Sequence, residues 1–308
     1  MTESTRRKVR TLWVMAALLA AVGVVVGISG IGSSDVQSAD VSRPTGDPAD
    51  RLRGLAADLS EDASYRPPTS AERKQAIAGL TGLIDGQLPR ATQDLMPLGF
   101  TVSDGTDPVT NRRYTLVVNE PDSDRAWGVY LIDTSAPLSL VVEVPHPNFD
   151  LGTERIGVDL FRQVPGSVLL MSGTHRRAED GAGDVAHRND SLFHALAVEL
   201  GSRDIPQVQL HGFHDKTLEG TDIVISPGAG EPNPLVRETA DNLANAGLAV
   251  CRAWSKDCGK LEGTRNQQGR NAAENGTVFL HVEINRTVRD DNAMSSRLVR
   301  AIADAMKK

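Results

Sequence analysis

The sequence has few aromatic residues and no concentrated positive charge. Only 4% of the 308 residues are aromatic, so a hydrophobic core must be built mainly from Ala, Val, Leu and Ile. The formal net charge is −7, and no basic tract with interleaved aromatic residues occurs. Because a nucleic-acid surface normally needs a basic stripe for the phosphates, the composition argues against a nucleic-acid partner.

The motifs of several common enzyme classes are also absent. No Gly-x-Ser-x-Gly sequence leads into a helix, which argues against a serine hydrolase of the α/β type. Neither a Walker loop nor a Gly-x-Gly-x-x-Gly fingerprint occurs, so nothing supports nucleotide binding. The two cysteines lie in no papain-like sequence, and a cysteine nucleophile is therefore unsupported.

The chain begins with a basic segment followed by a long uncharged one. Four basic residues between Arg6 and Arg10 precede an uncharged run from Thr11 to Ser34. This order is typical of an export signal, and the run approaches the ~20 residues needed to span a bilayer. We predict that residues 1–34 are a signal anchor, with a cleaved signal peptide as the alternative. The positive residues favour a cytoplasmic N-terminus, which makes the rest of the chain extracytoplasmic, either membrane-anchored or secreted.

Cys251 and Cys258 are the only cysteines, and they lie close together. In an exported chain such a pair predicts a disulfide that closes a small loop. Two free thiols are the alternative. A thiolate metal site is less favoured, because no His lies near enough in the sequence to complete it.

The chain divides by pattern into three parts after the N-terminal segment. Residues 35–68 are rich in Ser, Asp, Pro, Gly and Ala, and we predict a flexible linker with one or two helical turns at 51–59 as an alternative there. Residues 69–135 are predicted to form a helix that starts near Thr69, followed by a β-hairpin that flanks or extends the main sheet. Residues 136–308 show strands alternating with helices, which predicts an α/β domain.

The alternation in the last part indicates a mixed, mostly parallel central sheet with flanking helices, of the phosphorylase/hydrolase-like kind. In such sheets ligands bind at the carboxyl ends of strands. The predicted strands lie at 138–144, 167–173, 206–213, 222–228, 248–254 and 277–284, and the predicted helices at 153–163, 190–200, 234–246 and 295–306.

All seven histidines lie between His146 and His281, and several stand at the ends of apolar runs. Imidazole is a common metal ligand, and carboxylates often complete such sites. We predict a metal site with His146 and His211 as ligands, and with either Asp150 or Glu154 as the carboxylate beside His146. Carboxylates this close to a helix start also commonly serve only as caps.

Glu283 follows His281 at the spacing that puts both side chains on one side of a strand. A carboxylate there suits the general base for a metal-activated water. The alternative is a buried ion pair with Arg286 or Arg289.

Candidate substrate-binding residues lie in polar loops after the strands. Arginine forks and amides bind carboxylates well. On this ground we predict Arg176, Arg188, Asn189 and Asn266 as substrate-binding residues. Solvated loops with charges of both signs are an equally good interpretation of these stretches.

Together, His146, Asp150, His211 and Glu283 resemble the site of the zinc carboxypeptidase-like hydrolases, especially the poly-γ-glutamate hydrolase and N-acyl-amino-acid amidohydrolase branches. Asp150-Leu151-Gly152-Thr153 is similar to the Glu-x-Gly-Thr of the former. The resemblance covers about residues 138–306 and implies a zinc ion on His146, Asp150 and His211, with Glu283 as base. Two departures are Asp in place of Glu at 150 and the lack of the His-x-x-Glu pair of the carboxypeptidases proper.

The hypothesis from the sequence is therefore an exported, zinc-dependent hydrolase. It would cleave an amide bond next to a carboxylate in a peptide, a γ-glutamyl compound or an N-acyl amino acid. A non-catalytic cell-envelope binding protein on the same fold is the alternative, and a histidine cluster without metal is a third. The expected partners are the substrate and, through the N-terminal segment, the membrane.

Overall fold

The structure, a computed structural model, describes residues 46–120 and 123–307. The chain divides into two units, Met1–Gln37 and Ser38–Lys308, and the described residues all belong to the second. The predicted signal anchor, residues 1–34, lies outside them. Within the part that the structure describes, no helix is both long and apolar enough to cross a membrane.

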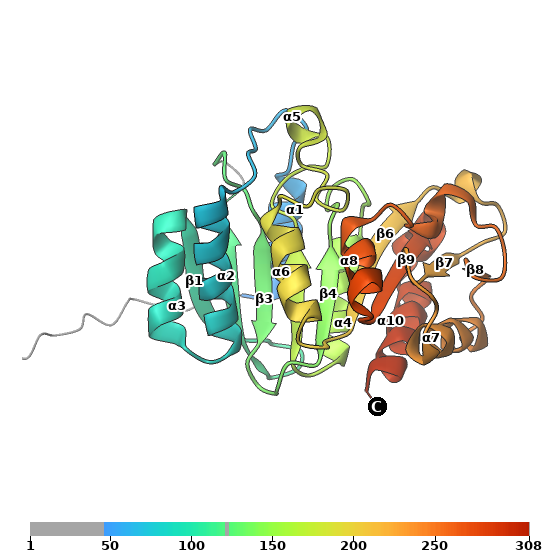
Figure 1. The fold of residues 1–308 in the computed structure, drawn as a ribbon. Helices are drawn as coiled ribbons and strands as arrows, with labels where there is room; N and C mark the ends of the chain where they lie inside the picture. Colours follow the sequence, from blue (N-terminus) through green and yellow to red (C-terminus); the bar gives the residue numbers. More distant parts are fainter. Residues whose placement is uncertain (1–45, 121–122, 308) are drawn as a thin grey trace, which may run out of the picture. The chain divides into compact units, whose positions relative to one another are not determined.

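A single mixed sheet runs through the described residues (Figure 1). Its strand order is β1-β2-β3-β5-β4-β6-β9-β7-β8. The strands are β1 (Phe100–Thr106), β2 (Arg113–Asn119), β3 (Val129–Asp133), β4 (Leu140–Val144), β5 (Ser167–Met171), β6 (Gln207–Phe213), β7 (Ile223–Ser226), β8 (Val250–Arg252) and β9 (Phe279–Asn285).

The predicted α/β architecture is confirmed, and its parallel part is the centre of the sheet. Strands β5, β4, β6 and β9 are mutually parallel neighbours. The predicted hairpin is β2 and β3, and β3 pairs antiparallel with β5. The hairpin therefore extends the main sheet, which is one of the two arrangements that the sequence leaves open.

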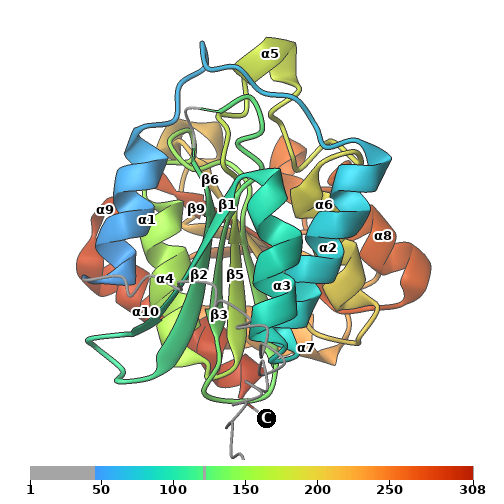
Figure 2. The same cartoon turned by 90° about the vertical axis from the view of Figure 1, so that its left-hand side faces the viewer.

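Helices cover both faces of the sheet, as Figure 2 shows. One core packs α1, α4, α7 and α10 against the first face, and another packs α2, α3 and α6 against the second. The helices are α1 (Pro48–Ala57), α2 (Ser70–Ile84), α3 (Leu88–Leu95), α4 (Thr153–Gln163), α5 (Ala178–Gly181), α6 (Leu192–Gly201), α7 (Pro234–Asn245), α8 (Gln267–Asn275), α9 (Arg286–Asp290) and α10 (Asn292–Met306), with short 3-10 turns η1 (Met96–Leu98), η2 (Asp215–Thr217) and η3 (Gly259–Glu262).

The two faces of the central strands differ in polarity. Apolar residues at alternate positions of β4, β6 and β9 point into the first core, among them Val142, Leu210 and Val282. Because side chains alternate along a strand, the residues between them point to the other face. These are largely polar and buried: Glu143, Gln207, Gln209, His211 and His281. Helix α8 packs beside α6 over this polar strip.

The predicted linker at 35–68 is wrong over Pro48–Ala57, which forms a full helix where the sequence indicates at most one or two turns. Helix α1 begins after Asp47, whose side chain accepts a hydrogen bond from the backbone of Ala49. Leu52 and Leu55 are buried in the first core. The extent of this helix was not predicted because the Ser-, Asp- and Ala-rich composition gives no sustained apolar period.

Five further helices and strands were not predicted: β1, α3, α5, α8 and α9. Strand β1 is an edge strand with exposed and half-buried positions, so it shows no apolar run. Helix α8 buries Gln268, Gly269 and Ala272, a polar face that suits the polar strip beneath it. Such a helix has no apolar period to find in the sequence.

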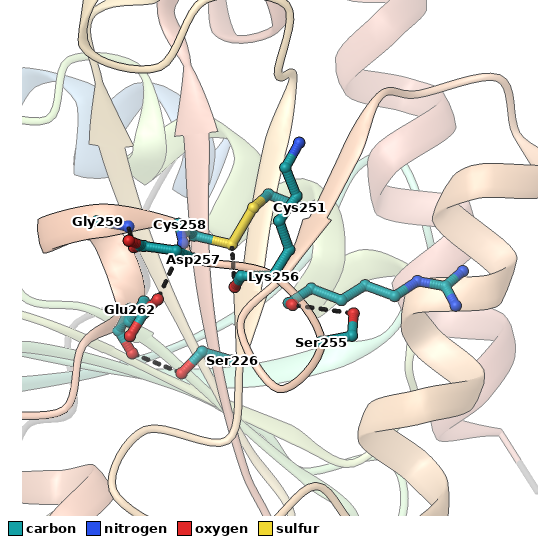
Figure 3. Close-up of a disulfide and its surroundings, with 9 residues drawn as sticks. Ser226, Cys251, Ser255, Lys256, Asp257, Cys258, Gly259 and Glu262 are labelled. Atoms are coloured by element: carbon teal, nitrogen blue, oxygen red, sulfur yellow. Dashed lines mark hydrogen bonds between the residues drawn. A yellow bond between two sulfur atoms is a disulfide. The ribbon is translucent and has the colours of Figure 1, made fainter.

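The predicted disulfide between Cys251 and Cys258 is present, and Figure 3 shows its surroundings. Cys258 directly precedes η3, and its backbone nitrogen donates to the Glu262 carboxylate at 2.9 Å. The carbonyl of Glu262 in turn accepts from the hydroxyl of Ser226 at the end of β7. The disulfide and these two bonds fix η3 against the sheet.

Buried Arg289 joins the ends of three chain segments. Its guanidinium donates to the carbonyls of Ile284, Leu151 and Phe213 at 3.0, 2.5 and 2.9 Å. These carbonyls belong to β9, the loop after β4 and the end of β6. Gly212 permits the approach, because a Cβ there would lie 2.5 Å from the guanidinium carbon. Arg289 therefore fixes the strand ends relative to one another.

We predict that Arg289→Met lowers the free energy of unfolding by about 2–5 kcal/mol, because three buried carbonyls lose a charged donor. Urea denaturation measures this change. The matched control is Arg286→Met in the same helix, where the arginine pairs with Asp290 at the surface and should contribute about 1 kcal/mol or less. Equal losses in the two variants would contradict the role given to Arg289.

Candidate metal centre

Three parallel strands end at one edge of the sheet and carry the candidate site. His146 follows β4, while His211 and Glu283 lie on β6 and β9, where they are direct partners in the register. Because β4, β6 and β9 are parallel neighbours, their carboxyl ends meet. The fold therefore brings these predicted site residues together at this edge of the sheet.

A tight loop returns Asp150 toward His146. The backbone nitrogen of Asp150 donates to the carbonyl of His146 at 2.9 Å. Asn148 has a φ of 59°, a left-handed conformation that asparagine tolerates better than most residues. Gly152 has a φ of 90° and directly precedes α4. The loop thus supplies a nitrogen and an oxygen ligand from one short segment.

Two imidazoles and one carboxylate converge on a single point. Nδ1 of His146 and Nδ1 of His211 each lie 3.2 Å from the same oxygen of Asp150, Oδ2. The opposite nitrogens are occupied: Nε2 of His146 lies 2.8 Å from Asp184 Oδ1, and Nε2 of His211 lies 2.6 Å from Gln209 Oε1. All three converging side chains are buried.

The pKa values of the clustered side chains depend on their burial and on the neighbouring carboxylates. Burial opposes charge on His146, but hydrogen bonds to Asp150 and Asp184 outweigh it and raise the pKa of this imidazole. Burial lowers the pKa of His211 to about 4, so His211 is neutral near pH 7. Burial opposes the charge of Asp150 as well, yet the two histidines hold its pKa well below the usual range.

This donor set fits a metal ion. A neutral imidazole whose Nε2 carries the proton presents a lone pair at Nδ1, and an ionised carboxylate only accepts. Three acceptors that face one point need a cation or a proton between them. Their atoms lie within 4.8 Å of one another, as ligands of one ion must. Small displacements would bring each to a normal metal–ligand distance of about 2.0–2.2 Å.

A second group of potential ligands consists of His211, His281 and Glu283. The two groups share His211, and a neutral imidazole offers only one lone pair to a metal. They therefore do not describe two ions bound together. Because Nδ1 of His211 faces Asp150, the first group is the better metal site, and Glu283 lies beside it.

Glu283 has no salt bridge to compensate its charge. The alternative ion pairs are wrong: Arg286 binds Asp290, and Arg289 binds backbone carbonyls. Burial, with a further contribution from Asp150, raises the pKa of Glu283 well above its ordinary value. Its Oε2 has no hydrogen-bond partner among the described residues. Such a carboxyl can take up and hold a proton.

A cavity of about 500 Å³ opens onto the cluster. His146, His211, His281 and Glu283 form its floor. One wall is a continuous segment that we call the cavity wall, residues 259–266, which contributes Lys260, Glu262, Arg265 and Asn266 among others. The disulfide described above lies directly before this wall.

The predicted substrate-binding residues are only partly brought together. Arg176 lines the cavity, where it binds Asp184 at 2.7 Å and packs over the ring of Phe149. Asn266 lines it too, although its amide is bonded internally. Arg188 and Asn189 are exposed and do not line the cavity, and Arg188 pairs with Asp190. Their predicted role is not supported.

Glu154, the alternative ligand, points elsewhere. Its carboxylate accepts from the backbone nitrogen of Gly152 at 3.0 Å in the first turn of α4. It belongs to neither group of potential ligands. Asp150 is therefore the better carboxylate, and the Glu154 alternative is a helix-terminal contact.

Sequence reasoning missed Asp184, Gln209 and Glu143. Asp184 accepts from His146, Arg176 and His187, three contacts across loops that have no fixed sequence spacing. Gln209 and Glu143 are partners in the register of β6 and β4. A signal for them existed, because polar residues at alternating positions inside apolar strands indicate a polar interior face.

No protein-family model matches the chain, and no curated protein matches it either. Among solved structures, a metallo-carboxypeptidase from Burkholderia cenocepacia is 14% identical over 78% of this chain and 70% of that one, with a TM-score of 0.36. An aspartoacylase family protein from Mesorhizobium loti is 12% identical over 68% and 67%, with a TM-score of 0.39. A Legionella pneumophila aminopeptidase is 10% identical over 83% and 69%, with a TM-score of 0.38.

The names of these structures match the class to which the sequence resemblance points, the zinc carboxypeptidase-like hydrolases. Their identities and TM-scores are low. What this chain does must therefore be inferred from its own residues.

The buried acid Glu143 generates a pH prediction. Burial raises its pKa to about 8 from 4.5, so between these pH values the folded state holds a proton that the unfolded state has lost. The free energy of unfolding of the wild type should therefore fall as pH rises, by up to ~1.4 kcal/mol per pH unit. Glu143→Gln removes this dependence. Urea denaturation near pH 5 and near pH 8, with a chelator present, compares the two proteins, and parallel stability profiles would refute the prediction.

Proposed function

We propose that this protein is a zinc-dependent hydrolase that cleaves an amide bond next to a carboxylate. The observation that carries the proposal is the meeting of His146 Nδ1, His211 Nδ1 and Asp150 Oδ2, with Glu283 beside them. Two imidazoles and one carboxylate with an adjacent cavity are the donor set of catalytic zinc sites, which keep a fourth position open.

His146, Asp150 and His211 would hold the zinc ion. When bound, zinc lowers the pKa of a water molecule and polarises a carbonyl oxygen. The contact of His146 with the Asp184 carboxylate orients the ring and makes its Nδ1 a better donor. The chain therefore supplies both ligands and the support that fixes their direction.

Glu283 would act as the general base. It shares its strand position with His211 across the β6–β9 pair, and their ligand atoms lie within 4.8 Å. Its unpaired Oε2 is free to accept a proton from water and to return it to the leaving amine. A carboxyl whose pKa is raised by burial is suited to this exchange near neutral pH.

The cations of the cavity support a substrate that carries a carboxylate. The cavity is lined by three cationic side chains, Arg176, Lys260 and Arg265, and by two acidic ones, Glu262 and Glu283. Arginine binds a carboxylate in a bidentate manner. A peptide C-terminus, a γ-glutamyl compound or an N-acyl amino acid would each place a carboxylate near the amide to be cleaved.

We also propose that the protein acts outside the cytoplasm. The N-terminal segment has the pattern of an export signal or anchor, as argued above. The Cys251–Cys258 disulfide supports this proposal, because disulfides persist mainly in oxidising compartments.

The first test is metal content. We expect one zinc ion per chain in protein purified without chelator. Asp150→Asn should weaken zinc binding by more than the ~10–100-fold that loss of an outer partner costs. Glu154→Gln is the matched control and should bind zinc like the wild type. Wild-type protein that takes up no zinc, or loss of zinc in Glu154→Gln alone, would refute the assignment.

The second test is the role of Glu283. Glu283→Gln keeps the shape and should keep zinc, but the rate of amide cleavage should fall by about 10²–10⁴-fold. The assay compares dipeptides, γ-glutamyl dipeptides and N-acyl amino acids with their carboxylates free or amidated. Full activity of the variant would remove the mechanism. Zinc binding without turnover of any amide would favour a non-catalytic binding protein.

A further inference from the structure

A chain of buried amides leads from the N-terminus of helix α8 to His211. Asn266 caps this helix, and its Oδ1 accepts from the backbone nitrogens of Gln268 and Gly269 at 3.0 and 3.2 Å. A backbone N–H can only donate. The oxygen of the Asn266 amide is therefore fixed toward the helix, and its NH₂ group faces the other way.

The orientation of Asn266 determines that of Gln209. The Nδ2 of Asn266 donates to Gln209 Oε1. The other end of the Gln209 amide, Nε2, donates to Glu143 Oε2 at 2.6 Å and to Gln268 Oε1 at 3.3 Å. Reversing this amide would place its NH₂ group against that of Asn266 and its oxygen against Gln268 Oε1, whose own NH₂ group donates to the carbonyl of Val185. Gln209 is thus held with its oxygen toward the cavity side.

That oxygen faces His211, 2.6 Å from its Nε2. An amide oxygen only accepts, so Nε2 of His211 must carry the hydrogen. A neutral imidazole then has its lone pair on Nδ1, which is the nitrogen directed at Asp150. From the backbone of α8 to the metal site, each group in this chain of hydrogen bonds is therefore fixed as a donor or as an acceptor.

Burial leaves these amides no alternative hydrogen-bond partners. Asn266, Gln209, Glu143 and Gln268 are all buried, so bulk water does not offer replacement partners. Glu143 is neutral near pH 7, because burial raises its pKa to about 8. The support of His211 is therefore uncharged, in contrast to the Asp184 carboxylate behind His146.

We propose that Gln209, fixed by Asn266 and Glu143, is a positioning residue that holds His211 in the tautomer able to bind a metal through Nδ1. This inference rests on the metal site of the proposed function and adds the device that prepares one of its ligands. Gln209 touches no reacting atom and acts only through His211.

The test compares two glutamines of the same strand. In the full-length protein, Gln209→Met keeps the length of the side chain but removes the acceptor, and we expect zinc affinity to fall about 10–100-fold. Gln207→Met is the matched control, because Gln207 is equally buried on the same face of β6 and makes no hydrogen bond to His211. Competition with a chromophoric chelator measures the affinities, and thermal unfolding measures stability.

The control variant should bind zinc like the wild type and change little in stability, because Gln207 Oε1 has no hydrogen-bond partner among the described residues. The conservative variant Glu143→Gln, which can still accept from Gln209, should also keep the wild-type affinity. Unchanged zinc affinity in Gln209→Met, or the same loss in Gln207→Met, would overturn the proposal, since either result would mean that the hydrogen bond to His211 does not matter.

Imidazole ¹⁵N spectra of metal-free protein test the tautomer directly, with the His211 signal assigned from a His211→Gln variant. We expect the Nε2–H form in the wild type and its loss in Gln209→Met. The Nδ1–H form in the wild type would overturn the proposal, even if Gln209→Met fails to fold. The spectra need no metal, so failure of the wild type to bind zinc would refute the proposed function without deciding this inference.

Discussion

Three hydrogen-bond acceptors directed at one point are the constraint around which the rest of the structure is arranged. The lone pairs of His146, His211 and Asp150 repel one another unless a cation or a proton lies between them. Each imidazole is therefore held from behind, by Asp184 and by Gln209. The guanidinium of Arg289 fixes the strand ends that carry these residues. The site is prepared by contacts that lie outside it.

The need to hold these side chains in place determines the polarity of the two faces of the sheet. One face of β4, β6 and β9 is apolar and packs against helices in the ordinary way. The other face has buried Glu143, Gln209 and His281 where a core would place valine or leucine. Burying such groups is costly unless they are hydrogen-bonded. Helix α8 meets this need with Gln268 instead of an apolar side chain.

Much of the central fold could be predicted from the sequence, because its strands are apolar runs and α4 has the predicted bounds. The meeting of His146, Asp150 and His211 could be predicted as well, since parallel strands bring their carboxyl ends to one edge. Their partners could not: Asp184 reaches His146 across a loop, and Gln209 meets Glu143 only through the strand register. The full extent of α1 could not be predicted for a related reason, because packing decides it and local composition does not.

The position of Asn266 links the contents of the cavity to the metal. Asn266 lines the cavity. Its amide sets the orientation of the Gln209 amide, which in turn sets the tautomer of His211. If the proposed ion binds, a molecule in the cavity that shifts Asn266 would change the affinity of the site for that ion. Thermodynamic reciprocity then requires that the ion change the affinity for that molecule by the same factor. In the proposed function, metal and substrate would thus be coupled through a helix cap.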